Sequence, residues 1–109
     1  MQLSDILSAD GIVPSLKVSS KKQALQELSA IAAKQTGLDA RQVFETLLQR
    51  ERLGSTGLGQ GIAIPHGKMA GLDKLHTVFA RLSQPIDFDS VDDQPVDLIF
   101  LLLAPESAG

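Results

Sequence analysis

VDLIFLLLA, residues 96–104, is the stretch that decides the fold of this 109-residue chain. Apart from Asp97 it is apolar throughout, yet it is far shorter than the roughly 20 apolar residues that span a membrane. An unbroken apolar run of this length is typical of a central strand whose two faces are both covered. We therefore expect an α/β fold in which helices pack against a sheet that contains this strand.

Upstream of this strand, the first helical pattern follows a pair of serines. Ser19 or Ser20 can act as the N-cap, and Gly37 ends the helix. Between them, apolar residues repeat at the spacing of one buried helix face: Ala24, Leu25, Leu28, Ile31 and Ala32. We expect this stripe to pack in the core.

A second helical pattern begins at Asp39, and Gln42 stands three residues later, where it can complete a capping box. Gly54 ends this helix. Its inner stripe consists of Val43, Phe44, Leu47 and Leu48. This stripe is also expected to face the core.

After residue 54 the hydrophobic period changes to that of strands. Residues 62–64 are short and apolar enough for a strand, and residues 75–82 alternate weakly between apolar and polar. Gln84 and Pro85 are expected to interrupt the second of these strands. The order of helices first and strands later supports the layered α/β fold.

The N-terminal residues lack the basic and apolar regions of a signal peptide, so a cytoplasmic location is expected. Asp10 and Gly11 signal a turn. A strand is expected at residues 12–13, and Pro14 is expected to end it.

Composition narrows the class of protein further. The net charge of −3 and the pI of about 5.2 argue against a protein that attracts nucleic acid through its net electrostatic charge. The absence of cysteine excludes disulfides, thiolate catalysis and cysteine-ligated metals. The length suits one compact domain.

Residues 54–68, GSTGLGQGIAIPHGK, contain five of the nine glycines. In this segment His66 stands between a proline and a glycine. Glycine permits backbone conformations closed to other residues and lets a ligand approach the main chain. Pro65 biases Ile64 toward extended geometry. The segment predicts a histidine held at a tight, exposed bend.

Three kinds of site fit this segment poorly. In residues 61–68 the glycines are one residue too far apart for a nucleotide-binding Walker loop. A metal site would rest on His66 and His76 alone, with no cysteine and no carboxylate at ligand spacing. Hydrolysis would need Ser55 or Ser83 as nucleophile, but no nucleophile elbow is present.

A fourth hypothesis is that His66 is itself the nucleophile and carries a phosphoryl group. A neutral imidazole offers a nitrogen lone pair near cellular pH. Stabilising the charge on the phosphoryl oxygens is mainly a matter of positioned donors. Backbone N–H groups of the loop, the hydroxyls of Ser55 and Thr56, and a guanidinium from Arg50 or Arg52 could supply them. For Arg52 a solvated helix end is the preferred interpretation.

Residues 50–68, RERLGSTGLGQGIAIPHGK, resemble the active-site signature of enzyme IIA domains of the phosphoenolpyruvate-dependent phosphotransferase system. They resemble the fructose/mannitol class (EIIA type 2), and most of all its nitrogen-regulatory branch. The resemblance continues through residues 94–100, QPVDLIF, and backwards through both helical patterns. It implies a single domain over residues 1–109, with a mixed β-sheet sandwiched between helices.

The resemblance also implies a set of site residues. His66 would accept a phosphoryl group from a phosphohistidine on a small HPr-like carrier and become a tele-phosphohistidine. Arg50, Ser55, Thr56 and Gly67 would shape the phosphate environment. No metal and no cofactor are expected.

The resemblance leaves the downstream partner open. In the nitrogen-regulatory branch the two phosphorylation states would bind regulatory target proteins differently. One alternative is the IIA component of a fructose/mannitol-type sugar uptake system, which passes the phosphoryl group to a IIB domain. Another is a regulatory protein-binding module for which phosphorylation is only the switch. Neither nucleic-acid binding nor membrane insertion is expected.

Members of this family run to about 150 residues, as one domain of ordinary size. They carry a second active-site histidine after the strand equivalent to residues 96–104. This sequence has no histidine there, and His76 lies in a different segment. We therefore expect a C-terminally truncated domain that lacks its C-terminal helices and self-associates through an uncovered sheet face.

Overall fold

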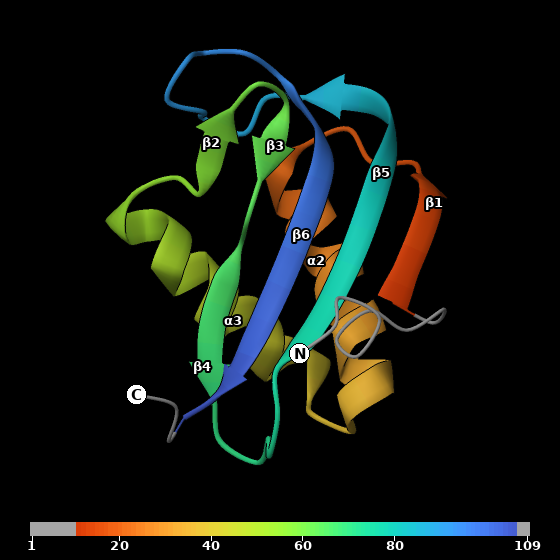
Figure 1. The fold of residues 1–109 in the computed structure, drawn as a ribbon, viewed down its shortest axis with the longest axis vertical. Coiled ribbons are helices and arrows are strands. Elements are labelled where there is room, and N and C mark those ends of the chain that lie inside the picture. The colour runs from red at the N-terminus through yellow and green to blue at the C-terminus, as the bar shows by residue number, and fades with distance from the viewer. Residues whose placement is uncertain (1–10, 107–109) are drawn as a thin grey trace.

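The computed structural model describes residues 11–106, so Asp10 of the predicted turn lies outside the described residues. Within these residues, the chain forms one strand, two helices and then five strands (Figure 1). In order these elements are β1 (Ile12–Leu16), α2 (Lys21–Thr36), α3 (Ala40–Leu53), β2 (Gly57–Gly59), β3 (Ile62–Ala63), β4 (His66–Met69), β5 (His76–Ile86) and β6 (Val96–Pro105). Neither helix of this part of the chain is long and apolar enough to cross a membrane.

The ends of α2 follow the predicted capping chemistry. Ser20 is the N-cap, and its hydroxyl accepts a hydrogen bond of 3.1 Å from the backbone N–H of Gln23. The Gln23 side chain accepts in return from the backbone N–H of Ser19, at 2.8 Å. Gly37 ends the helix with φ of 79°, the left-handed conformation that favours glycine. Both predicted boundaries of this helix are confirmed.

The start of α3 differs from the prediction. Asp39 does occupy the N-cap position, but its side chain makes no capping hydrogen bond, so the predicted capping box with Gln42 was wrong. The first turn instead begins on a backbone bond of 3.1 Å from the N–H of Val43 to the carbonyl of Asp39. Packing therefore contributes more to this helix than its cap does.

The predicted helical stripes lie in the core except for Leu48, which is partly buried and borders a surface hollow. The fully buried side chains on the two helices include Leu25, Leu28, Val43 and Leu47. Ile31 and Phe44 are partly buried and pack against the same core. Burial of each leucine contributes about 2 kcal/mol relative to exposure, so these stripes are the main link between helices and sheet.

Strand β6 lies in the centre of a mixed sheet, as its apolar sequence predicts. It pairs antiparallel with β5 on one side and parallel with β3 and β4 on the other. β1 then pairs parallel with β5, and β2 pairs antiparallel with β3. The sheet order is β1-β5-β6-β3-β2, with β4 also along β6.

Two predicted strand boundaries at prolines were wrong. β1 runs through Pro14 to Leu16, and β5 runs through Pro85 to Ile86. In both strands the register shifts across the proline, between Val13 and Leu16 and between Arg81 and Ile86. Proline lacks a donor for the ladder, but an irregularity of register lets the strand continue past it.

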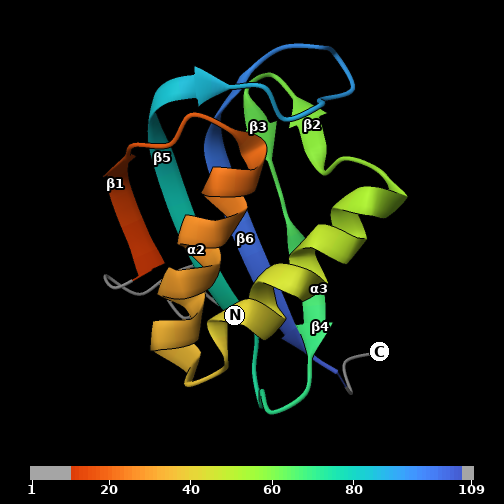
Figure 2. The ribbon, with the colours of Figure 1, turned by 180° about the vertical axis from the view of Figure 1, so that it is seen from behind.

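The two helices lie on the same face of the sheet (Figures 1 and 2). On β6, Ile99, Leu101 and Leu103 are fully buried beneath this helical layer, and Phe100 and Leu102 alternate with them and are only partly buried. The mixed α/β fold is confirmed. Of the predicted sandwich, residues 11–106 contribute one helical layer.

We call the face away from the helices the open face, and define it by Phe79, Leu98, Phe100 and Leu102. These four side chains are partly buried, and the rings of Phe79 and Phe100 lie 4.8 Å apart between centroids at an angle of 50°. Ile12, the Cα partner of Phe79, remains 46% exposed. Self-association through this face stays a prediction.

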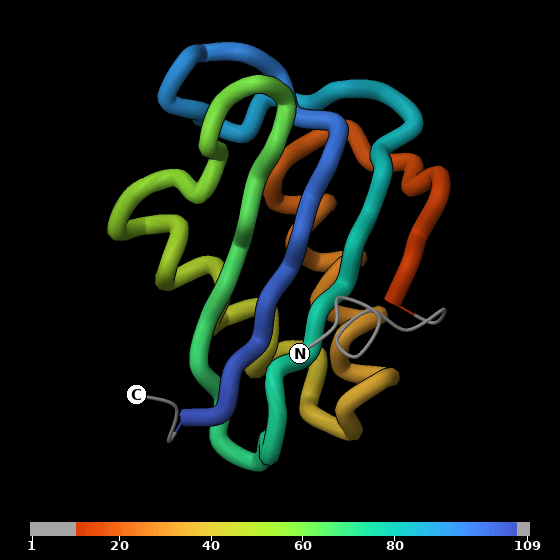
Figure 3. The backbone as a smooth tube through the Cα atoms, viewed as in Figure 1, coloured from red at the N-terminus to blue at the C-terminus, as the bar shows by residue number. Residues whose placement is uncertain are grey.

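The smooth backbone trace shows residues 57–69 as a hairpin whose second arm follows β6 along its length (Figure 3). That second arm contains β3 and then β4. The loop before β6 lies against the first arm of the hairpin, where the N–H of Val91 donates to the carbonyl of Gly57 at 3.3 Å. This hairpin carries the candidate site.

Candidate functional site

His66 is the first residue of β4, directly beside the central strand. Its Cα partner is Leu102, and the carbonyl of Pro65 accepts from the N–H of Leu102 at 2.9 Å. His66 is exposed, as predicted, but it lies on a strand and not at a tight bend. Although Pro65 cannot donate a hydrogen bond, its carbonyl still accepts one, so the chain continues along β6.

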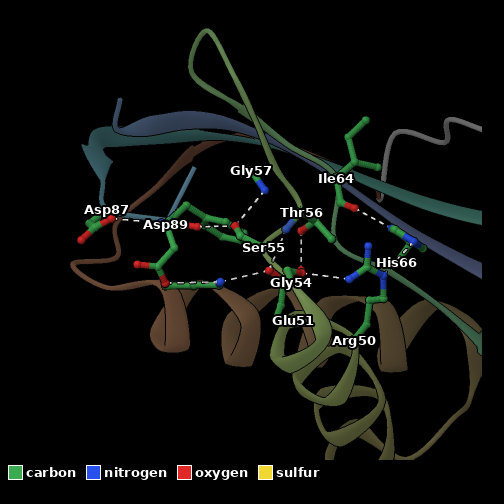
Figure 4. Close-up of polar contacts among 12 residues, drawn as sticks. Arg50, Glu51, Gly54, Ser55, Thr56, Gly57, Ile64, His66, Asp87 and Asp89 are labelled. Carbon is green, nitrogen blue, oxygen red and sulfur yellow. Dashed lines mark hydrogen bonds and ion pairs between the residues drawn. The ribbon is translucent and has the colours of Figure 1, made fainter. Parts of the chain in front are cut away.

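The ring of His66 is oriented from both of its nitrogens (Figure 4). Nδ1 lies 2.8 Å from the carbonyl oxygen of Ile64, and Nε2 receives the Nε–H of Arg50 at 3.3 Å. Because a carbonyl oxygen can only accept, this contact requires the proton on Nδ1. Nε2 therefore carries the lone pair and faces the guanidinium. The geometry thus identifies Nε2 as the ring nitrogen that could act as a nucleophile.

Arg50 reaches His66 from the last turn of α3. Its Nη1 donates to the carbonyl of Gly54 at 2.9 Å, so two edges of the guanidinium are engaged at once. Arg52 lies two residues further on and is exposed. It borders a surface hollow together with Arg41 and Phe44, as expected of a solvated residue at a helix end.

The hydroxyls of Ser55 and Thr56 are engaged within the loop. Ser55 Oγ donates to the carbonyl of Phe88 at 2.6 Å and accepts from the N–H of Gly57 at 3.0 Å. Thr56 is buried and its hydroxyl donates to the carboxylate of Glu51. Each hydroxyl has one proton, so neither can donate to a phosphate until its present bond breaks.

Gly67 is required by close packing between α3 and β4. A Cβ at this position would lie 2.7 Å from Cγ2 of Thr46 on the helix. Gly57 faces a similar constraint, since a Cβ there would lie 2.5 Å from Oγ of Ser90. The sequence suggested that the glycines make room for a ligand or partner, and at these two positions the space is filled by the chain itself.

The structure does not bring the two histidines together. His76 is the Cα partner of Leu103 on β5, whereas His66 is the partner of Leu102 on the other side of β6. Neighbouring residues of a strand alternate in direction, so the two imidazoles lie on opposite faces of the sheet. Within residues 11–106 no three histidine, aspartate or glutamate side chains gather as metal ligands.

Glu51 is a site residue that the sequence did not reveal. Its side chain is only 3% exposed and forms an ion pair with Lys21 at 3.0 Å. Its Oε1 also accepts from the backbone N–H of Thr56 at 3.0 Å. No role was expected for Glu51 from the sequence, but it continues the i, i+4 line of Val43 and Leu47, and that spacing could have identified it as buried.

Fold and site together define a small α/β protein that presents one oriented imidazole, backed by an arginine, on a strand beside the centre of its sheet. The family model of the phosphoenolpyruvate-dependent sugar phosphotransferase system, EIIA 2, matches residues 5–109. This chain belongs to that family, and the resemblance noted in the sequence is confirmed.

Relatives with established names agree with this assignment. The chain is 62% identical over 109 residues to the nitrogen regulatory protein of Bradyrhizobium diazoefficiens, covering 100% of this chain and 71% of the relative. It is 50% identical over 107 residues to the nitrogen regulatory protein of Escherichia coli K12, covering 96% of this chain. The chain spans 65% of the length of that second relative.

Two solved structures share the fold. The crystal structure of the nitrogen regulatory protein IIA-Ntr from Neisseria meningitidis superimposes with a TM-score of 0.91 at 46% identity, covering 95% of this chain and 71% of that one. Enzyme IIA of mannitol from Escherichia coli, determined in complex with phosphorylated enzyme IIB, gives a TM-score of 0.77 at 26% identity. That match covers 93% of this chain and 72% of the mannitol enzyme chain.

Proposed function

We propose that this protein is a phosphocarrier, in which Nε2 of His66 accepts a phosphoryl group from a phosphohistidine on an HPr-like protein. The observation that carries the proposal is the orientation of the ring. Nδ1 is held by the carbonyl of Ile64, which leaves the Nε2 lone pair directed at Arg50. A nucleophile beside a guanidinium is what phosphoryl transfer requires.

The transfer step uses only groups that the site contains. The Nε2 lone pair attacks phosphorus, and the electron pair of the breaking P–N bond returns to the imidazole of the donor. The product keeps its proton on Nδ1, bonded to Ile64. Arg50 leaves Nε2 and turns its N–H groups to the phosphoryl group. Its guanidinium can donate hydrogen bonds to two phosphoryl oxygens at once. Ser55, Thr56 and Gly67 are assigned to the surroundings of the phosphate.

We assign the function of the protein to regulation and not to sugar uptake, because relatives with 62% and 50% identity are nitrogen regulatory proteins. Phosphorylation adds about −1.5 to −2 charges, enough to change the affinity of a partner protein. The alternative is transfer to a IIB domain, which is favoured by the resemblance to a mannitol enzyme IIA solved with phosphorylated IIB. A cytoplasmic location stays a prediction.

The test is incubation with phosphoenolpyruvate, enzyme I and an HPr-type carrier, followed by a phosphate-affinity gel. The wild-type chain is expected to take up one phosphoryl group, and His66→Ala none. His76→Ala is the matched control, because it removes the second histidine from the opposite face of the sheet. Phosphate on His66→Ala, or a wild-type chain that stays unmodified, would overturn the proposal.

A further inference from the structure

The carboxylate of Glu51 is buried at the end of α3 and is fully bonded. Lys21 Nζ lies 3.0 Å from Oε1, the N–H of Thr56 donates to Oε1 at 3.0 Å, and the Thr56 hydroxyl donates to Oε2. Lys21 also lies 3.6 Å from Asp89 and 4.8 Å from the ring centroid of Phe88. Three donors from two other segments converge on one carboxylate.

This arrangement is an inefficient way to add stability. Desolvation of a buried ion pair largely cancels the attraction between its charges, and an apolar residue of similar size often stabilises as well. Glu51 stands at the end of the Val43 and Leu47 stripe, where an apolar side chain would continue the core. A buried carboxylate there gives directional hydrogen bonds, which fix geometry in a way that apolar contact does not.

The bonds of Glu51 lead to His66 in three steps. Glu51 holds the N–H and hydroxyl of Thr56. The carbonyl of Thr56 accepts from the N–H of Ile64 at 3.0 Å. The carbonyl of the same Ile64 lies 2.8 Å from Nδ1 of His66. Glu51 is therefore linked, through Thr56, to the residue whose carbonyl holds the ring (Figure 4).

Arg50 and Glu51 are consecutive residues, and they support the ring from its two sides. Arg50 contacts Nε2 directly and holds the carbonyl of Gly54. Glu51 acts two residues further along the loop, at Thr56. The last turn of α3 thereby fixes both the position of the Arg50 guanidinium and the orientation of the His66 ring.

We propose that Glu51, neutralised by Lys21, is a positioning residue for His66. It fixes Thr56, and through Thr56 the backbone of Ile64, so that the proton stays on Nδ1 and Nε2 faces the incoming phosphorus. The effect on the ring is independent of the assigned activity, and only the effect on rate rests on the proposed function. Substitution at Glu51 lowers the transfer rate constant and leaves the affinity for the donor protein nearly unchanged.

The decisive variant is Glu51→Gln, which keeps the shape and one acceptor oxygen but removes the charge opposite Lys21. Nitrogen-15 NMR of the imidazole is expected to report a single Nδ1–H form in the wild type and a mixture of tautomers in the variant. Rapid-mixing transfer from the phosphorylated carrier is expected to slow by about tenfold to a hundredfold at unchanged KM. Glu45→Gln is the control, because Glu45 is an exposed carboxylate on the same helix that pairs with Arg41.

Two further variants separate positioning from loss of fold. Thr56→Val removes the hydroxyl and keeps the backbone bond, so a smaller change in tautomer and rate is expected. Lys21→Arg keeps the charge and is expected to retain the wild-type tautomer, whereas Lys21→Met is not. If Glu51→Gln fails to fold, these variants decide the question.

The outcomes distinguish the two proposals. Wild-type tautomer and rate in folded Glu51→Gln, or in Thr56→Val together with Lys21→Met, would overturn the positioning role. A wild-type chain that accepts no phosphate would overturn the proposed function, while the NMR comparison would still decide the role of Glu51.

Discussion

Arg50 and His66 are joined by a hydrogen bond of 3.3 Å from Nε to Nε2, although one lies on the last turn of α3 and the other on β4. The ring nitrogen that the guanidinium covers is the one that carries the lone pair. In the proposed function, the arginine orients the ring before transfer and stands within reach of the phosphoryl oxygens afterwards.

Arg50→Ala is expected to slow phosphorylation of His66 by about a hundredfold, because a positioned donor to the developing charge is lost. Arg50→Lys is expected to recover little, since an ammonium cannot contact Nε2 and Gly54 with two edges at once. Initial rates with the phosphorylated carrier measure both effects. Arg52→Ala is the control, and an equal loss in that variant would contradict a specific role for Arg50.

Gly67→Ala is expected to destabilise the fold by about 1–3 kcal/mol, the usual result of overpacking. The cause is the methyl group of Thr46, which lies 2.7 Å from the place of the new Cβ. Denaturant titration measures the change. The double variant Gly67→Ala with Thr46→Ser should recover most of the loss because the methyl group is gone, and no recovery would show that the contact is not responsible.

Ser55→Ala is expected to lower the free energy of unfolding by about 1–2 kcal/mol, since the carbonyl of Phe88 and the N–H of Gly57 each lose a partner. Its effect on the transfer rate should be modest, because the Ser55 proton is directed at Phe88. Unfolding and transfer are measured on the same preparation, with the exposed Ser83→Ala as control. A large loss of rate at unchanged stability would mean that Ser55 acts on the phosphate.

The carboxylate of Asp92 is expected to stabilise the tip of the hairpin in a way that depends on acidic pH. Its carboxylate accepts from the backbone N–H groups of Gln60 at 2.9 Å and Gln94 at 3.0 Å. These bonds, that of Gln60 first, hold the pKa of Asp92 below its ordinary value. A lowered folded pKa means that the stabilisation is complete above the unfolded value of about 3.9 and is lost as pH falls through the folded value.

Asp92→Asn should therefore lose part of the acid dependence of stability seen in the wild type. Denaturant midpoints across acidic pH measure this dependence. Asp73→Asn, at an exposed aspartate, is expected to follow the wild-type curve. Parallel curves for wild type and Asp92→Asn would mean that the carboxylate does not hold the hairpin tip.

Several features of the fold follow from local sequence. The stripes of α2 and α3, the cap at Ser20 and the stop at Gly37 are set by period and by single-residue chemistry, so they could be predicted. Pro14 and Pro85 could not be judged in the same way. A proline blocks one hydrogen bond, and whether the strand continues depends on the register of its neighbour.

Some features of the candidate site also follow from the sequence, whereas others depend on the tertiary structure. The chain itself predicts His66 as the reactive group, because the only other histidine stands in a different segment and no cysteine competes with it. It also determined the family, through a contiguous signature. Tertiary structure decided which ring nitrogen is free, because that depends on the Ile64 carbonyl and on Arg50, which lies 16 residues away.

The spacing of Glu51 after Val43 and Leu47 could have indicated its burial, but its hydrogen-bond partners were decided by tertiary structure. A carboxylate near a helix end is solvated in most sequences, and only the approach of Lys21 and of the loop at Thr56 makes this one a buried acceptor. Residue type and spacing determine which groups can react. The hydrogen bonds that aim them are formed between distant segments, and only the packed fold brings those segments together.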